Sequence, residues 1–249
     1  MNFEVNGYNI FIIVAVCFLS SLIFVQIMKK VAIFLKVLDV PNDPRKIHKK
    51  PMPLLGGLGI FFAFLLGYML FAPKNNLMIA VLIGSFLIML LGLFDDMTKS
   101  ETPMPNKYKV IVQLIVAAIV VFYGGLELTK ITLFGMTITF TSIPFLSEFL
   151  SIIIIVATIN AINLIDGLDG LCAGISSIYF LTIAIIGFIL NKFGGLDVIL
   201  SLIMLGSTLG YLVHNFPPAR IYQGDAGSTF LGFMIAVIFL LGFKTTTLT

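Results

Sequence analysis

The chain has 249 residues, of which 59% are hydrophobic and only 11% are charged, and its net charge is +3. A soluble domain carries about 25% charged residues, so this chain has too few charges to solvate the surface of a soluble globule. The long apolar runs exclude a disordered chain, and the small net charge excludes a nucleic-acid-binding protein with a broad basic face. The composition therefore predicts an integral membrane protein.

Eight apolar segments without Asp, Glu, Lys or Arg follow one another along the chain. Each has about 16–20 residues, the length of an α-helix that crosses roughly 30 Å of hydrocarbon. The segments lie at 9–28, 54–72, 77–94, 110–126, 149–165, 171–190, 198–213 and 226–243. We therefore predict an all-α polytopic membrane protein with about eight transmembrane helices.

The charged residues are unequally divided between the two sides of these segments. The loops on one side carry eleven of the fifteen Lys and Arg residues, eight of the twelve acidic residues and both histidines. Because basic loops stay in the cytoplasm, we predict a multi-pass cell-membrane protein with its N-terminus outside and its functional groups at the cytoplasmic face.

Three smaller features complete the predicted architecture. The outside segment 130–140 alternates on both sides of Gly135-Met136, which predicts a small β-hairpin. Residues 31–37 are interpreted as a short amphipathic helix along the inner interface. Cys17 and Cys172 fall inside apolar segments, so we expect both to be buried free thiols rather than a disulfide.

The first two inner loops carry basic and acidic groups. The loop 39–57 contains His48 and Lys50 in a basic cluster, which either attracts phosphate or contacts anionic lipid head groups. Asp95 and Asp96 end the third segment, where the helix dipole disfavours negative charge. A metal, a cationic ligand or a proton-transfer role would account for this pair, and two solvated end residues remain the alternative. Lys109 follows closely enough to hold phosphate beside them.

The last two inner loops add amides and further carboxylates. Asn160, Asn163 and Asp166 form one polar stripe on a helix, and their oxygens suit Mg²⁺, although Asn can also join helices. The motif continues as Asp-Gly-Leu-Asp169-Gly. The loop after the seventh segment ends at Asp225, a helix cap or a metal ligand. We expect free N–H groups at the start of the eighth segment to bind an anion.

These loops meet on one face of the predicted bundle. Carboxylates that hold Mg²⁺, together with lysines and helix N-termini that hold phosphate, are the groups that phosphoryl transfer requires. The chain has no G-x-x-x-x-G-K-[ST] loop, so an ATPase lacks its usual phosphate cradle. The predicted substrate is a phosphate ester or anhydride met at the membrane surface.

Five stretches together resemble the polyprenyl-phosphate N-acetylhexosamine-1-phosphate transferase family, of the glycosyltransferase 4 type. They are DVPNDPRKIHKKPMPLLGG, LGLFDD, NKYKVIVQ, NAINLIDGLDGL and HNFPPARIYQGDAGS. They occur in the family's order and on the predicted cytoplasmic side. The resemblance implies transfer of a sugar 1-phosphate from a UDP-sugar to a polyprenyl phosphate, with release of UMP and with Mg²⁺ or Mn²⁺ as cofactor.

Two branches of this family compete. The first and last stretches resemble the branch that transfers N-acetylglucosamine 1-phosphate to undecaprenyl phosphate, which begins wall teichoic acid or O-antigen synthesis. The phospho-N-acetylmuramoyl-pentapeptide transferase branch usually reads TPTMGG and FMGD, where this chain reads MPLLGG and YQGD. The first branch is therefore expected, with the second as the alternative.

The resemblance also implies residue roles, carried over by position. Asp225 matches the principal metal ligand and Asn163 a second one, while Asp95 and Asp96 match a catalytic pair of which one takes a proton from the lipid phosphate. Lys109 matches the lysine that holds the diphosphate. The remaining residues implied in substrate binding are Asp166 and Asp169, at the nucleotide end, and His48, Lys50, His214 and Asn215.

We interpret residues 1–249 as a single integral membrane transferase domain. Family members usually continue through further spans and a last cytosolic loop, which we expect to be absent here. The alternatives to an enzyme are a non-catalytic fragment and a transporter of lipids or head groups, although the eight spans hold none of the charges that a transporter needs. The expected partners are the UDP-sugar, undecaprenyl phosphate and the bilayer, without nucleic acid; a homodimer is left open.

Overall fold

The computed structural model describes residues 4–5, 7–41, 50–98, 104–133, 136–190 and 195–246. Within these ranges seven helices are long and apolar enough to cross a membrane, and α2 is a shorter apolar helix. The expected all-α polytopic membrane fold is therefore confirmed. The helices are α1 (Ile10–Phe34), α2 (Gly56–Phe71), α3 (Asn76–Thr98), α4 (Asn106–Ala118) with its π-helical extension η1 (Ile119–Tyr123), α5 (Leu146–Leu164), α6 (Leu171–Ile189), α7 (Leu196–Asn215) and α8 (Gly224–Thr246).

Short antiparallel strand pairs connect some of these helices. The predicted hairpin is confirmed, since β5 (Lys130–Leu133) pairs with β6 (Met136–Thr139). The other two pairs are β1 (Glu4–Val5) with β2 (Tyr8–Asn9), and β3 (Leu38–Asp39) with β4 (Met52–Pro53). The β3–β4 pair holds the end of α1 beside the start of α2.

The first helix is longer than expected. Asn9 caps its start, with its side-chain oxygen accepting a hydrogen bond from the Phe11 N–H at 2.9 Å. The helix then continues without a break to Phe34, so the prediction of a separate amphipathic helix over 31–37 is wrong. No Gly or Pro interrupts the segment before residue 34, and the helix ends only where Lys36 adopts a positive φ of 58°.

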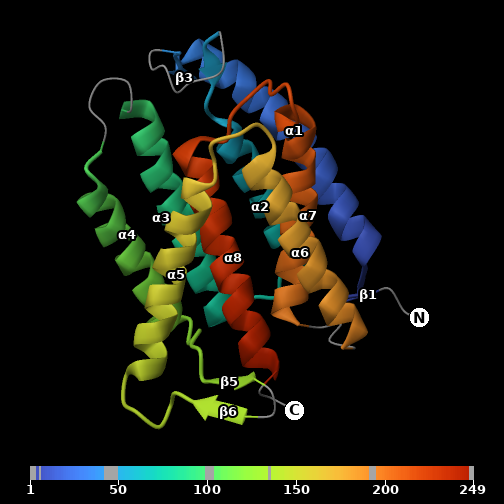
Figure 1. Ribbon diagram of the computed structural model, residues 1–249. Helices are drawn as coiled ribbons and strands as arrows, with labels where there is room; N and C mark the ends of the chain where they lie inside the picture. The colour runs from blue at the N-terminus through green and yellow to red at the C-terminus, as the bar shows by residue number, and fades with distance from the viewer. Residues whose placement is uncertain are drawn as a thin grey trace.

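The last helix, α8, lies at the centre of the bundle. It packs against α2, α3, α5, α6 and α7, and Figure 1 shows it in red between its neighbours. In its apolar span 83% of the residues are buried, against 22% in α1 and in α5. The exposed faces of these outer helices are apolar, as expected for surfaces that meet hydrocarbon chains.

The two ends of the bundle carry different connecting segments (Figure 1). One end, here called the polar end, carries β3, the turn 165–170, the loop 216–223 and the first residues of α2, α6 and α8. The opposite end carries β1 and the β5–β6 hairpin. Because each helix crosses the bundle once, residues far apart in the sequence gather at the polar end.

Backbone hydrogen bonds join the starts of α2 and α8 there. Gly56 N–H donates to the Tyr222 carbonyl at 2.9 Å, and Gly57 N–H donates to the Gln223 carbonyl at 3.0 Å. A third bond returns from Tyr222 N–H to the Pro53 carbonyl at 2.8 Å. A Cβ atom on Gly57 would overlap the backbone of α8, so only glycine permits this approach. These contacts fix the position of the loop that precedes Asp225.

Candidate active site

A lysine and two carboxylates from three helices meet at the polar end. Lys109 Nζ, on α4, lies 2.6 Å from Asp95 Oδ2 on α3 and 3.0 Å from Asp225 Oδ2 on α8. Asp95 is buried, whereas Lys109 and Asp225 are partly exposed. The structure thus brings together three residues singled out in the sequence, here called the Lys109 cluster. Because Lys109 is partly exposed, an anionic ligand can approach its ammonium group from solvent. The two carboxylates hold the lysine side chain in position.

The second oxygen of Asp95 has no hydrogen-bond partner. Asp95 Oδ1 is buried and unpaired, although Oδ2 of the same carboxylate accepts from Lys109. Leaving a buried carboxylate oxygen unpaired is costly. The arrangement therefore leaves one anionic oxygen available to a proton or a cation beside Lys109.

Asp96 lies in a different environment from its neighbour. Its Oδ1 accepts the Asp225 N–H at 2.8 Å, and its Oδ2 accepts the Ala226 N–H at 3.0 Å. The expectation of free N–H groups at the start of α8 is therefore wrong for these two donors, because the Asp96 carboxylate occupies them. An anion that binds at the polar end therefore needs donors other than the N–H groups of Asp225 and Ala226.

Asn163 lies against the first turn of α8. Its side-chain amide donates to Ser228 Oγ at 2.8 Å, and Ser228 Oγ donates to the Gly224 carbonyl at 3.1 Å. Ser228 follows Asp225 by three residues and so lies on the same side of α8. Asn163 and Asp225 therefore lie on neighbouring surfaces of α5 and α8. Ser228 is a site residue that was not expected from the sequence, and its spacing of three residues from Asp225 was the available signal.

A second polar contact lies deeper between α4 and α5. Asn160 Nδ2 donates to Gln113 Oε1 at 2.6 Å and to the Val156 carbonyl at 2.7 Å. Gln113 is 2% exposed. Gln113 and Lys109 are one helical turn apart, so this contact supports the α4 surface that presents the lysine.

The turn 165–170, which carries the two aspartates expected at the nucleotide end, is tied to the loop 216–223. Asp169 Oδ2 accepts the Ala219 N–H at 2.9 Å, and Asn215 Oδ1 accepts the Gly170 N–H at 2.9 Å. Burial and the nearby Asp169 carboxylate, with which the Tyr222 hydroxyl forms a hydrogen bond, raise the pKa of that hydroxyl to about 12. Asp169 and Asn215 therefore hold the loop 216–223 against the turn 165–170.

The other residues implied in substrate binding lie elsewhere. His214 is buried against α1, where the Gln26 side-chain nitrogen lies 3.4 Å from His214 Nδ1. Asp166 is partly buried in the turn after α5, and Lys50 is exposed before β4. His48 lies outside the described residues. The structure thus brings Lys109, Asp95 and Asp225 together, with Asn163 against the same turn of α8, whereas the printed contact of His214 is with α1.

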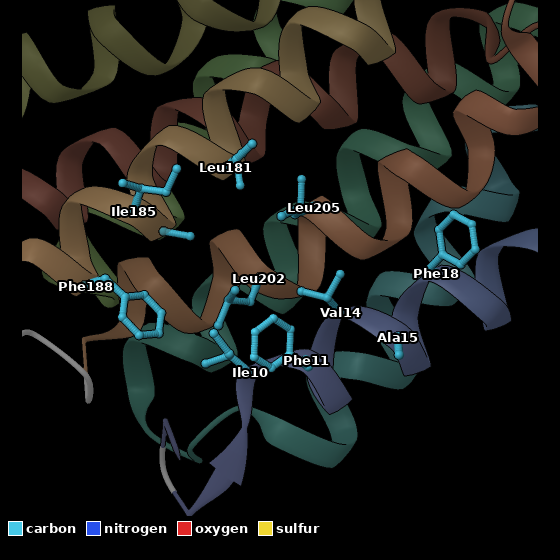
Figure 2. Close-up of a pocket in the computed structure, with 11 residues that line it drawn as sticks. Ile10, Phe11, Val14, Ala15, Phe18, Leu181, Ile185, Phe188, Leu202 and Leu205 are labelled. Atoms are coloured by element: carbon cyan, nitrogen blue, oxygen red, sulfur yellow. The ribbon is translucent and has the colours of Figure 1, made fainter. Parts of the chain in front are cut away.

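A groove between α1, α6 and α7 offers a contrasting environment (Figure 2). It has a volume of about 430 Å³, and apolar side chains such as Phe11, Leu181 and Leu202 line it. It lies towards the start of α1 and the end of α6, away from the polar end. Without a charged or amide side chain, this groove cannot hold a phosphate.

The oxygen donors at the polar end are of the chemical kind that Mg²⁺ prefers. The described residues contain no group of three His, Cys, Asp or Glu side chains placed to hold a metal. Mg²⁺ usually takes one or two protein carboxylates and completes its shell with water and substrate phosphates. Asp225 and the carbonyl oxygen of Asn163 supply such a partial set, and the unpaired Asp95 oxygen adds negative charge nearby.

Comparison with known proteins places the chain in a protein family. The sequence matches the family described as glycosyl transferase family 4 over residues 78–243. A "Probable undecaprenyl-phosphate N-acetylglucosaminyl 1-phosphate transferase" of Bacillus subtilis (strain 168) is 40% identical over 94% of this chain and 63% of that protein. An "Undecaprenyl-phosphate alpha-N-acetylglucosaminyl 1-phosphate transferase" of Salmonella typhi is 32% identical over 90% of this chain and 59% of that protein.

A "Phospho-N-acetylmuramoyl-pentapeptide-transferase" of Caldanaerobacter subterraneus subsp. tengcongensis is 30% identical over 91% of this chain and 72% of that protein. The chain thus spans less than two thirds of the Bacillus and Salmonella relatives. The identity of 40% supports the expected resemblance to the N-acetylglucosaminyl branch. Since the family match covers most of the chain and includes Asp95, Lys109, Asn163 and Asp225, the chain belongs to glycosyl transferase family 4.

Proposed function

We propose that this protein is a phosphotransferase that moves N-acetylglucosamine 1-phosphate from UDP-N-acetylglucosamine to undecaprenyl phosphate and releases UMP. The product initiates a cell-wall polymer such as teichoic acid. The observation that carries the proposal is the Lys109 ammonium, held between carboxylates from α3 and α8 beside an unpaired Asp95 oxygen. The names of the Bacillus and Salmonella relatives support an N-acetylglucosaminyl 1-phosphate group and an undecaprenyl-phosphate acceptor.

The reaction needs few covalent steps. An oxygen of the lipid phosphate attacks the β-phosphorus of the UDP-sugar, and the bond from that phosphorus to the oxygen shared with the α-phosphate breaks. UMP leaves with the bonding electrons. Lys109 neutralises charge on the diphosphate as the bond breaks, and Asp95 Oδ1 accepts the proton of the lipid phosphate.

Two residues of this chain would hold the cation. Asp225 provides a carboxylate at the start of α8, and Asn163 provides a neutral oxygen from α5. Bound Mg²⁺ supplies charge stabilisation for the phosphoryl oxygens. Lys109 is then shared between the metal-binding carboxylate and the diphosphate, which keeps the substrate next to Asp95.

We further propose that the polar end faces the cytoplasm, where UDP-sugars are available. Asp166 and Asp169 lie on the turn beside the loop 216–223, on the side assigned to the nucleotide. Lys50, which is exposed before β4, is available to anionic groups at the same face. The bilayer brings undecaprenyl phosphate to this end with its phosphate at the interface.

UMP release tests the proposal directly. Membranes containing the protein are incubated with UDP-N-acetylglucosamine, undecaprenyl phosphate and Mg²⁺. We expect Lys109→Gln and Asp225→Asn each to lower kcat by about 10²–10³-fold, the usual cost of removing one group that stabilises transition-state charge. Lys107→Gln is the matched control, since Lys107 is exposed and its Nζ lies 5.0 Å from the Tyr108 ring centroid. This control should retain wild-type turnover.

The assay also separates the alternatives. Chelation of divalent cations should stop UMP release, and added Mg²⁺ should restore it. Undiminished release by Lys109→Gln would contradict the mechanism. Release with UDP-N-acetylmuramoyl-pentapeptide but not with UDP-N-acetylglucosamine would assign the protein to the alternative branch, whose members are also similar to this chain.

A further inference from the structure

The two adjacent aspartates of α3 have unlike partners. Asp95 directs one oxygen at Lys109 and leaves the other unpaired. Asp96 uses one oxygen for the Asp225 N–H and the other for the Ala226 N–H. Asp96 is also 4% exposed. The pair therefore offers one available oxygen, and it belongs to Asp95.

The bonds that Asp96 makes are those of a helix cap supplied by another helix. The first N–H groups of a helix have no partner within it and carry partial positive charge. A carboxylate that accepts two of them forms charge-assisted hydrogen bonds. Gly224 allows the approach, because it has a φ of +69° and any Cβ there would collide with the Asp96 carboxylate.

The cap acts on a residue of the Lys109 cluster. Asp96 binds the N–H of Asp225, the residue whose carboxylate lies 3.0 Å from Lys109 Nζ. Asp95, one position earlier on α3, contacts the same lysine. The α3 segment thus sets both the backbone and the side-chain environment of Asp225.

We infer that Asp96 is a positioning residue, which holds the start of α8 so that Asp225 faces Lys109 and the metal. Asp95 alone of the pair then accepts the proton. This inference rests on the proposed function and divides the acidic pair into two tasks. It predicts that Asp96 acts on metal affinity through Asp225, whereas Asp95 acts on the proton-transfer step.

Kinetic measurements on three variants test this division. Loss of a residue that orients a metal ligand costs about 10–100-fold in metal affinity, so Asp96→Ala should raise the Mg²⁺ concentration for half-maximal UMP release by that factor. Asp96→Asn keeps a side-chain acceptor and should recover part of this loss, with the wild-type pH profile. Asp95→Asn should lower kcat by about 10²–10⁴-fold with little change in the Mg²⁺ requirement.

Amide hydrogen exchange tests the cap without substrate. Exchange at residues 225 and 226 should be faster in Asp96→Ala than in the wild type and unchanged in Asp95→Asn. Unchanged exchange in Asp96→Ala would overturn the inference, as would an Asp96→Asn variant that loses as much kcat as Asp95→Asn. If Asp96→Ala does not fold, Asp96→Asn carries both measurements. If the wild type releases no UMP, the proposed function is wrong. The exchange measurement would still decide whether Asp96 caps α8.

Discussion

At the residue scale, the contact between Gln113 and Asn160 joins α4 to α5 at a buried position. Gln113 Oε1 accepts from Asn160 Nδ2 at 2.6 Å, and removal of this acceptor leaves the half-buried Asn160 amide with one partner fewer. We expect Gln113→Leu to lower the free energy of unfolding by about 1–2 kcal/mol, measured by thermal unfolding in detergent. The double variant Gln113→Leu/Asn160→Leu should cost less than the sum of the single variants. Strict additivity would show that the two side chains do not interact.

Some contacts of the site can be predicted from single residues of the sequence, and others cannot. Asp95, Lys109 and Asp225 are foreseeable as neighbours, because each lies where its apolar segment starts or ends on the same side. The cap made by Asp96 is not foreseeable in this way. It depends on which helix packs against α3, and the sequence near Asp96 contains no information about the N–H groups of α8.

At the element scale, α3 and α8 approach closely where both carry small residues. A Cβ atom on Gly92 would overlap the backbone of Ala226, so Gly92→Ala must push the two helices apart. Overpacking of this kind costs about 1–3 kcal/mol, and we expect a lower Tm in detergent together with loss of UMP release. The displaced helix carries Asp225 away from Lys109.

The matched control for this substitution is Gly174→Ala on α6. A Cβ atom on Gly174 meets no atom within 4 Å, and Ala is about 1 kcal/mol better than Gly inside a helix. Its Tm should therefore equal or exceed that of the wild type. Equal losses in both glycine variants would show that helix packing at Gly92 is not the cause.

The positions of the helices follow closely from the apolar segments, but their ends do not. A segment defined by the absence of charge stops before Asp95, whereas α3 continues through it to Thr98. Hydrophobicity measures where a chain can meet lipid, and a helix can extend beyond that limit when its polar side chains find partners. Asp95 and Asp96 find such partners on α4 and α8.

At the scale of the whole molecule, the orientation in the membrane is open to a direct test. Ser142 is exposed in the loop before α5 and Lys107 is exposed at the start of α4, while both native cysteines are buried. With the N-terminus outside, an impermeant maleimide should label Ser142→Cys on intact cells and Lys107→Cys only after lysis. The reverse pattern would place the Lys109 cluster outside the cell.

The order of helices around α8 could not be inferred from the sequence. All eight segments are strongly apolar, and in a bilayer a helix face is apolar whether it meets lipid or another helix. The difference between the 83% buried α8 span and the 22% buried α1 span therefore leaves little trace in residue type. Only close approaches such as those at Gly57 and Gly92 mark the central helix.

The central place of α8 has a consequence for biosynthesis. Translation proceeds from the N-terminus, so α8 emerges after α1 to α7. Until it inserts, α3 and α5 lack the helix against which they chiefly pack, and the site lacks Asp225 and the N–H groups that bind Asp96. A competent site therefore arises only when α8 has entered between α3 and α5, after the contacts among α1, α2, α6 and α7 are already possible.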